Sequence, residues 1–355
     1  MRMQYQDLRL AQQQIAERRL TEAEATLHRI LEVDPNEAHA LDLLGVIRAQ
    51  EHQNNQAETY FRKALAVRPD LAPAHANLGL LLQTTGRDEE ALAEYEAALK
   101  LDPTQSTASH GAPKVAERLA LKLSNEGHVD DALAVLARAK NVVPGSADLL
   151  FDYGMVAMQL QRYQEAASSL ESARKEDPND ARILYGLSRV RLAQQKMPEA
   201  EGLMRDYLKL RPDDATAHYG LGHILTMLLR IDEARTEFNR SIELAPQQTE
   251  SYIELADIEA QAGNARRAQE LYEHVLTRDP KHPAALAGMG ILAYRAKAYA
   301  QADTYLQQAV TAAPQYQTAH YYRGLTLARM GRTEESKAEL AVASDLAAQE
   351  RKPTH

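Results

Sequence analysis

The sequence predicts an all-α solenoid of about ten helical hairpins, and the first of three observations behind this is a fixed period. Nine prolines lie 34 residues apart with a single exception of 41: Pro35, Pro69, Pro103, Pro144, Pro178, Pro212, Pro246, Pro280 and Pro314. A constant spacing in the range of about 20–50 residues is the signature of a repeat architecture. The chain therefore divides into units of 34 residues with one insertion of seven.

The second observation is that other columns of this repeat keep a constant size. With each proline at position 32, position 20 is alanine in all but the last unit. Position 8 is small: Ala11, Gly45, Gly79, Ala120, Gly154, Ser188, Gly222, Ala256, Gly290 and Gly324. Position 24 is large: Leu27, Phe61, Tyr95, Leu136, Leu170, Met204, Phe238, Tyr272, Leu306 and Leu340. Because small residues allow two helices to approach closely, we expect positions 8 and 20 where the helices of a hairpin meet.

The third observation is the apolar pattern inside a unit. In ALDLLGVIRAQ, residues 40–50, apolar side chains recur mainly at helical spacing. A break such as Thr85-Gly86-Arg87 follows, and glycine there fits the C-terminal cap of a first helix. A second helix then runs through segments such as EEALAEYEAALKL and ends at the proline step, since proline cannot continue the hydrogen-bond ladder.

This unit resembles the tetratricopeptide repeat, whose pattern is small at 8, alanine at 20, large at 24, small at 27 and proline at 32. Position 27 departs from that pattern at Ile30, Tyr207 and Val275. The resemblance implies a right-handed superhelix of antiparallel helix-turn-helix units whose first helices line a concave groove. Proteins built in this way are usually binding scaffolds, although the repeats also occur fused to enzymes.

The period also predicts the domain organisation. We expect three units in residues 1–105, seven units continuing the same solenoid in residues 113–350, and a polar tail in residues 351–355. Residues 106–112 are the insertion. Seven residues make almost two helical turns, so a lengthened helix would keep its phase. Gly111 and Pro113 favour a kink or loop instead, and we prefer a tolerated surface insertion to a functional hinge.

Composition excludes several classes of function. The chain of 355 residues is 45% hydrophobic and 26% charged, which is typical of a folded protein. Its net charge of −9 argues against a nucleic-acid or anionic-membrane partner, because phosphate binding needs a concentrated basic surface. There is no cysteine, and no apolar run approaches a membrane span of about 20 residues. We expect a cytoplasmic chain, or a periplasmic one if a signal has been removed.

No motif predicts catalysis, a cofactor or a metal, so we expect no enzyme activity. Gly220-Leu221-Gly222 superficially resembles a dinucleotide motif, but it lies inside a first helix with no preceding strand. His218 and His223 are five residues apart, about 140° around a helix, which is poor geometry for shared metal binding.

A candidate peptide-binding site lies on the face of the first helices opposite their buried stripe. That face consists of positions 2, 5, 9, 12 and 13 of each unit. In the fifth to seventh units it includes Phe151, Met155, Met158, Arg182, Tyr185, Arg189, Tyr219, His223 and Met227. Aromatic, methionine and arginine side chains are typical of peptide-binding hot spots. The alternative is that these side chains only pack against neighbouring first helices.

Three hypotheses for function follow. The leading one is a scaffold that binds a protein or peptide segment in the groove. The others are a homotypic self-assembly module, and the repeat portion or adaptor of a glycosyl- or sulfotransferase system. The sequence does not support two peptide-binding modes known in this family, the carboxylate clamp and the asparagine ladder. Both need asparagines along the first helices. Position 9 contains no asparagine, and position 6 contains only Asn77.

Overall fold

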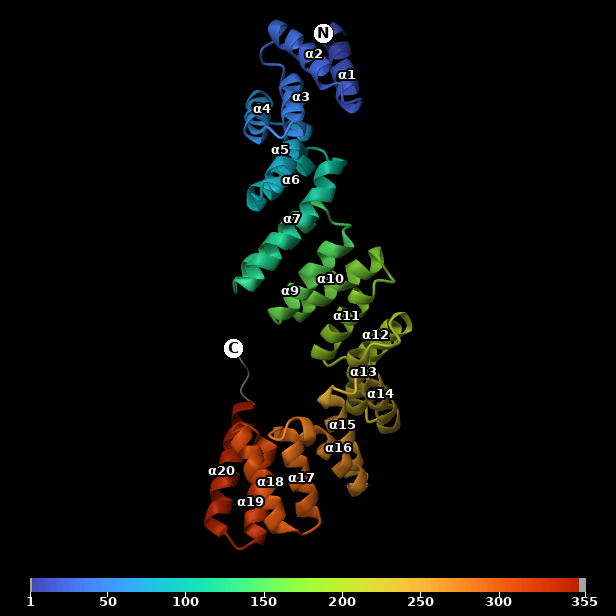
Figure 1. The fold of residues 1–355 in the computed structure, drawn as a ribbon, viewed down its shortest axis with the longest axis vertical. Coiled ribbons are helices and arrows are strands. Elements are labelled where there is room, and N and C mark those ends of the chain that lie inside the picture. Colours follow the sequence, from blue (N-terminus) through green and yellow to red (C-terminus); the bar gives the residue numbers. More distant parts are fainter. Residues whose placement is uncertain (1, 351–355) are drawn as a thin grey trace. The chain divides into compact units, whose positions relative to one another are not determined.

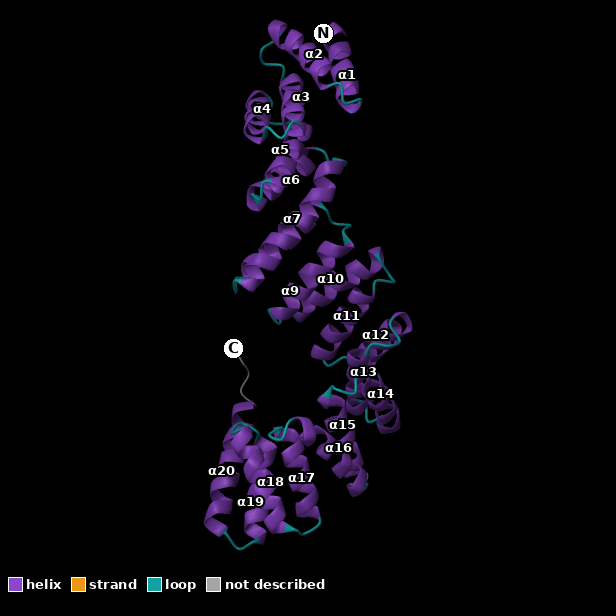
Figure 2. Ribbon diagram, in the orientation of Figure 1, coloured by secondary structure: helices purple, strands orange, loops and turns teal. Residues whose placement is uncertain are grey.

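The computed structural model describes residues 2–350, and within them it contains twenty α-helices and no strand (Figures 1 and 2). The predicted all-α class, a solenoid of ten helix-turn-helix repeats, is confirmed. The predicted polar tail, residues 351–355, lies outside the described residues. The chain forms two compact units, Met1–Gln194 and Gln195–His355, which we describe separately.

The first compact unit holds eleven helices. They are α1 (Arg2–Ala16), α2 (Leu20–Val33), α3 (Ala38–Gln50), α4 (Asn54–Val67), α5 (Ala72–Thr84), α6 (Asp88–Leu101), α7 (Ser106–Asn125), α8 (Val129–Val142), α9 (Ala147–Gln159), α10 (Tyr163–Glu176) and α11 (Ala181–Ala193). Odd-numbered helices are the first helices of the repeats and even-numbered helices are the second. A continuous core connects α4 to α9 through buried aliphatic, alanine and aromatic side chains.

The second compact unit holds the remaining nine helices. They are α12 (Met197–Leu210), α13 (Ala215–Met227), α14 (Ile231–Leu244), α15 (Thr249–Gln261), α16 (Ala265–Arg278), α17 (Pro283–Arg295), α18 (Tyr299–Ala312), α19 (Gln317–Arg329) and α20 (Thr333–Glu350). The predicted continuation of one solenoid through residues 113–350 spans both compact units and stays a prediction.

The hairpins close at position 8, where the sequence predicts a close approach, but the partner there is the large residue at position 24 and not only the predicted position 20. A Cβ atom built on Gly79 would lie 2.7 Å from Cδ1 of Tyr95, which is closer than real Cβ atoms come. Tyr95 is fully buried, so its ring cannot move aside. The same contact joins further pairs: Gly45 with Phe61, Gly154 with Leu170, Gly222 with Phe238, Gly290 with Leu306 and Gly324 with Leu340. The small column is therefore a steric requirement of the hairpin.

Every hairpin turn contains one residue with a positive φ, always at position 15. Glycine occupies it at Gly86, Gly127, Gly263 and Gly331, which confirms the predicted cap at Gly86. The other six turns have a side chain there: Arg18, His52, Gln161, Gln195, Leu229 and Lys297. A left-handed conformation costs an L-residue about 1–2 kcal/mol. The backbone of these six turns is therefore strained, and a glycine at the same position would remove the strain.

Residues 106–112 form the first turns of α7, so the expected loop is wrong. The preferred surface insertion is wrong as well, because Ala108, Gly111 and Ala112 are buried. The 34-residue period would start a first helix at residue 106, and α7 does begin there. Gly111 then takes position 6 and packs against Tyr95, as Gly288 packs against Tyr272 in the ninth repeat. Counted from residue 113 instead, position 8 is Ala120, which is buried in the same core as Leu136 of α8. α7 therefore packs against the third repeat in the register that starts at residue 106 and against α8 in the register that starts at residue 113.

The phase of the helix explains why the long α7 is tolerated. Seven residues advance a helix by about 700°, which is only about 20° short of two full turns. Both packed faces therefore stay on the same side. Pro113 removes one intrahelical hydrogen bond, but Gly111, Ala112, Val115 and Ala116 around it are all buried, and this packing holds the segment helical.

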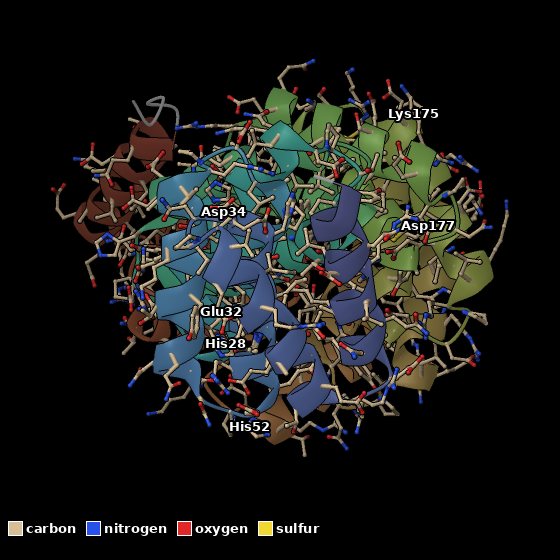
Figure 3. All side chains as sticks on the ribbon, turned by 90° about the horizontal axis from the view of Figure 1, so that it is seen from above. His28, Glu32, Asp34, His52, Lys175 and Asp177 are labelled. Atoms are coloured by element: carbon tan, nitrogen blue, oxygen red, sulfur yellow. The ribbon has the colours of Figure 1, made fainter. Side chains whose placement is uncertain are left out.

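Arginines at position 16 join consecutive second helices through ion pairs. Arg87 donates to Glu90 of its own helix over 2.6 Å and to Glu58 of the preceding second helix over 2.8 Å. Equivalent sets are Arg230 with Glu233 and Glu201, and Arg332 with Glu335 and Asp303. Other charged side chains, such as Lys175 and Asp177, project from the surface (Figure 3).

The strain at position 15 generates a prediction for Leu229→Gly. Leu229 is 83% exposed, so its side chain contributes little packing. Removing the left-handed strain should outweigh the added freedom of the unfolded chain and raise the free energy of unfolding by about 0.5–1 kcal/mol. The reverse change, Gly86→Leu, should lower it by about 1 kcal/mol. Urea titrations followed by circular dichroism measure both, and a destabilised Leu229→Gly variant would contradict the argument.

The phase argument for α7 is tested by two deletions. Removing residues 113–119 restores a 34-residue repeat that keeps Gly111 beneath Tyr95 and places Ala120 at position 8. We expect this variant to keep its helical circular dichroism and cooperative unfolding, at reduced stability because buried Val115 and Leu119 are lost. Removing only residues 113–117 rotates the two faces by about 140° relative to each other. That variant should lose helicity and become protease-sensitive; equal tolerance of the two deletions would show that register does not matter.

Candidate functional site

The nine predicted groove residues lie on α9, α11 and α13, and none of them is fully buried. Arg182, Arg189 and Met227 are exposed, and the other six are half-buried. We call the surface formed by positions 2, 5, 9, 12 and 13 of the first helices the first-helix face. Residues 151–189 of the predicted site belong to the first compact unit, while Tyr219, His223 and Met227 belong to the second. A single surface across both units stays a prediction.

Phe151 and Met155 partly pack against the neighbouring first helix. A Cβ atom on Gly186 of α11 would lie 3.1 Å from Sδ of Met155 and 3.5 Å from Cε2 of Phe151. Glycine at position 6 of the sixth repeat therefore leaves room for both side chains. The packing alternative thus holds for part of each of these two side chains, and the remainder of each is accessible.

Arg182 already has carboxylate partners. Its Nη2 atom donates to Oδ2 of Asp180 over 2.6 Å and to Oδ1 of Asp148 over 2.7 Å. Its guanidinium carbon lies 5.1 Å from the centre of the Phe151 ring. A carboxylate from a partner would have to compete with both aspartates. In the part of the chain that the structure describes, the Arg189 side chain makes no ion pair, so Arg189 is the better candidate for a partner's carboxylate.

Two carboxylates on first helices have pKa values raised to about 6. Burial raises the pKa of Asp152 to about 6, and the charges of Glu117 and Asp148 add to the effect. Burial also raises the pKa of Asp42 on α3 to about 6. Asp42 is 4% exposed and accepts a hydrogen bond of 3.0 Å from Nδ2 of Asn77 on α5. Neither carboxylate has a basic side chain within ion-pairing distance among residues 2–350.

A groove of about 560 Å³ opens beside Asn77, between α3 and α5. Its apolar lining includes Val46, Leu80 and Leu81. Leu80 is 45% exposed, although it is a large aliphatic side chain. The first-helix face therefore offers a partner an apolar surface in the second and third repeats, where the sequence analysis did not place one.

The part of the predicted site in the second compact unit is aromatic and acidic. The rings of Tyr219 and His223 are stacked with their centres 6.4 Å apart. Nδ1 of His223 lies 3.8 Å from Oε1 of Glu254 on α15. Burial raises the pKa of Glu254, and the His223 charge opposes that shift. Met227 at the end of α13 is 47% exposed.

His218 has a structural role that separates it from His223. Its Nδ1 atom lies 2.6 Å from Oε2 of Glu237, and its Nε2 atom lies 3.0 Å from the carbonyl oxygen of Pro212. The same arrangement recurs in His75 with Glu94 and Pro69, and in His320 with Glu339 and Pro314. These histidines join position 4 of a repeat to its own second helix and to the proline of the preceding repeat.

The side chains and helices of residues 2–350 also bear on metal binding and on membrane crossing. No group of three histidine, aspartate or glutamate side chains in this range is placed to hold a metal ion. No helix in this range combines the length and apolar character needed to cross a bilayer.

Models of the tetratricopeptide repeat match most of the chain. The matches cover residues 38–71, 72–105, 118–181, 154–215, 185–249 and 259–319. The first two coincide with the second and third units that the proline period defines. In sequence, 83 residues are 31% identical to protein O-mannosyl-transferase F38B6.6 of Caenorhabditis elegans. That match covers 23% of this chain and 12% of the other protein, so this chain spans only a small part of that relative.

Solved structures show the same fold. A tetratricopeptide repeat protein from Parabacteroides merdae is 17% identical, with a TM-score of 0.57 over 66% of this chain and 93% of that chain. PilF from Pseudomonas aeruginosa is 19% identical, with a TM-score of 0.53 over 61% of this chain and 99% of that chain. At such identities the likeness concerns the fold alone.

The raised pKa of Asp152 generates a prediction for Asp152→Asn. The folded chain binds this proton with a pKa of about 6, against 3.8 for an ordinary aspartate. Stability is therefore lost as the pH rises from about 4 to about 6, because the charged form is disfavoured only in the folded state. The variant should be more stable than the parent by about 1–2 kcal/mol at pH 8, allowing for screening at a half-buried site, and equal to it below about pH 4. Urea titrations at several pH values measure this, with Asp131→Asn as the exposed control; a constant difference would contradict it.

Proposed function

This chain belongs to the tetratricopeptide repeat family, and we propose that it is a non-catalytic scaffold that binds a peptide or protein segment on its first-helix face. The repeat fold is a protein-interaction fold, and it occupies most of the chain. We place the centre of the site in the fifth to seventh repeats.

The observation that carries this proposal is the accessibility of the predicted stripe. All nine of its side chains keep exposed surface, although large apolar and aromatic residues usually lie inside a fold. Tyrosine, methionine and arginine supply the contacts that dominate peptide binding. Methionine side chains also adapt to irregular apolar partners, which suits Met158 and the exposed Met227.

The ion pairs divide the stripe into positioning and recognition residues. Arg182 is held by Asp148 and Asp180, so its main contribution is to fix the Phe151 ring beneath its guanidinium. Arg189 keeps its charge available for a partner, and Tyr185 and Tyr219 present half-buried rings on neighbouring first helices of the repeat series. An extended or helical partner segment laid along this face is the natural mode of binding.

A second candidate function is the repeat portion or adaptor of a glycosyl- or sulfotransferase system. The similarity of 83 residues to a protein O-mannosyl-transferase favours it. This candidate requires that transferase activity appear only when another polypeptide is present. Homotypic self-assembly is the third candidate, and light scattering over a range of protein concentrations separates it from the others, because it alone requires the mass to rise with concentration.

The proposed site is tested by changing Tyr185, Arg189 and Tyr219 to alanine together. We expect affinity for captured partners and for selected peptides to fall at least tenfold, since hot-spot side chains typically contribute more than about 1 kcal/mol each. The matched control changes the exposed Arg29, Lys100 and Arg266, which lie on second helices, to alanine. Affinity capture and fluorescence polarisation compare the two variants after circular dichroism has verified their folds. Unchanged binding by the first variant would refute the site.

A further inference from the structure

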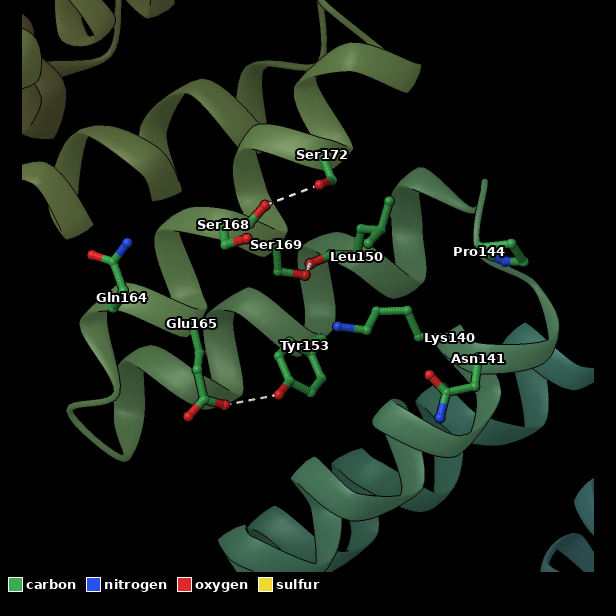
Figure 4. Close-up of a pocket in the computed structure, with 10 residues that line it drawn as sticks. All are labelled: Lys140, Asn141, Pro144, Leu150, Tyr153, Gln164, Glu165, Ser168, Ser169 and Ser172. Carbon is green, nitrogen blue, oxygen red and sulfur yellow. Dashed lines mark hydrogen bonds between the residues drawn. The ribbon is translucent and has the colours of Figure 1, made fainter.

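A second groove, of about 590 Å³, lies between α8 and α10 in the first compact unit (Figure 4). Its polar lining comes mainly from the second helices of the fourth and fifth repeats, not from the first-helix face. It includes Lys140, Asn141, Tyr153, Gln164, Glu165 and Ser168. The proposed function does not use this groove.

Serines on α10 create the space. Ser169 at position 23 stands where the second, third and fourth repeats have Tyr60, Glu94 and Val135. Ser172 at position 26 stands where the first, second and fourth repeats have Arg29, Lys63 and Arg138. The Ser169 hydroxyl donates to the carbonyl oxygen of Leu150 over 2.7 Å, and the Ser172 hydroxyl donates to the carbonyl oxygen of Ser168 over 3.0 Å. Both short side chains are thus held against the backbone, and the volume above them stays open.

Two residues of the groove also depart from apolar columns of the repeat. Lys140 occupies position 28, where the first three repeats have Leu31, Leu65 and Leu99 and the fifth has Arg174. Tyr153 occupies position 7, where the first four repeats have Leu10, Leu44, Leu78 and Leu119. Both departures occur at the junction between the fourth and fifth repeats. Here a polar pair replaces aliphatic packing, which lowers stability. Such a destabilising change suggests that the pair has a function other than packing.

Lys140 contacts an aromatic ring and not a described carboxylate. Its Nζ atom lies 3.8 Å from the centre of the Tyr153 ring. Desolvation lowers the pKa of Lys140 and the charge of Glu165 opposes that shift, but no described carboxylate lies within ion-pairing distance of Lys140. The nearest acidic group of the groove, Glu165, accepts a hydrogen bond of 2.9 Å from the Tyr153 hydroxyl instead. The groove therefore contains a half-buried ammonium group that makes no direct ion pair with a described carboxylate.

We propose that this groove is a second binding site, which takes an aspartate or glutamate side chain of a partner polypeptide. Lys140 supplies the cation. The Ser168 hydroxyl and the side-chain amides of Asn141 and Gln164 line the same space as hydrogen-bond donors. Glu165 limits the charge that the groove accepts, because its repulsion of a phosphate dianion is about twice its repulsion of a carboxylate. A single carboxylate is the ligand that this balance favours.

The repeat columns supply a decisive variant, Lys140→Leu. If Lys140 is retained for binding, then restoring the leucine of the earlier repeats should keep or raise the melting temperature and abolish carboxylate binding. Lys140→Gln, which keeps a polar chain without the charge, should abolish binding as well. Lys122→Leu is the matched control, because it removes one positive charge from an exposed position of α7.

A library of random dodecapeptides displayed on phage provides the probe, selected on the immobilised full chain. We expect a class of peptides whose binding falls at least tenfold on Lys140→Leu and Lys140→Gln, is unchanged on Lys122→Leu, and needs an aspartate or glutamate in the peptide. The absence of any Lys140-dependent peptide would overturn the proposal. So would Lys140-dependent peptides that still bind after their acidic residues are changed to amides.

The same experiment keeps the two proposals apart. Peptides that lose binding on the Tyr185, Arg189 and Tyr219 alanine variant belong to the first-helix face and test the proposed function alone. A melting temperature of Lys140→Leu several degrees below that of the parent would show that Lys140 is a structural residue, and it would overturn the second site whatever the peptides do.

Discussion

The structure depends on the contact between a small residue at position 8 and a large residue at position 24. Where glycine occupies position 8, no side chain could be added without displacing a buried one: Gly222 faces Phe238 at 2.7 Å, and Gly154 faces Leu170 at 2.6 Å, measured from a built Cβ atom. This contact fixes the rotation of the first helix within its hairpin. Positions 5, 9 and 12 border this contact: Gln83 at position 12 accepts a hydrogen bond of 2.6 Å from the Tyr95 hydroxyl, and the centre of the Tyr219 ring at position 5 lies 6.0 Å from that of Phe238.

The columns of the repeat made the fold predictable from sequence, and also the accessibility of the predicted stripe. Proline at position 32, alanine at position 20 and the two size columns define the hairpins without any structural information. The insertion was harder, because Gly111 and Pro113 are helix-breaking residues when considered singly. The deciding facts are that seven residues nearly complete two turns and that Gly111 meets Tyr95 of the preceding repeat. Packing between repeats, which a single unit does not reveal, overrides the local preference.

Charge pairing is the part of the site that the helix pattern did not predict. Arg182 was expected to be available to a partner, but Asp148, 34 residues earlier and at the same position of the preceding repeat, neutralises it together with Asp180. Comparison of one column between adjacent repeats could have found Asp148. The ion pairs of position 16 follow the same logic on the second helices, where Arg87 bridges Glu58 and Glu90. The first helices also carry the opposite case, since Asp42 and Asp152 are desolvated without an arginine partner.

In a repeat protein the same structural position occurs ten times in one chain, so a residue can be compared with its equivalents in the other repeats. Position 28 is leucine in five repeats and basic in two, at Lys140 and Arg174, so the fold can be built without Lys140. At Lys140 the departure coincides with a second departure at Tyr153, with short serines on α10 and with an ammonium group that makes no direct ion pair with a described carboxylate. Random drift would scatter such changes among the repeats, whereas a binding site requires them together. Their convergence on one groove is therefore the strongest reason to look for a ligand there, independent of what the first-helix face binds.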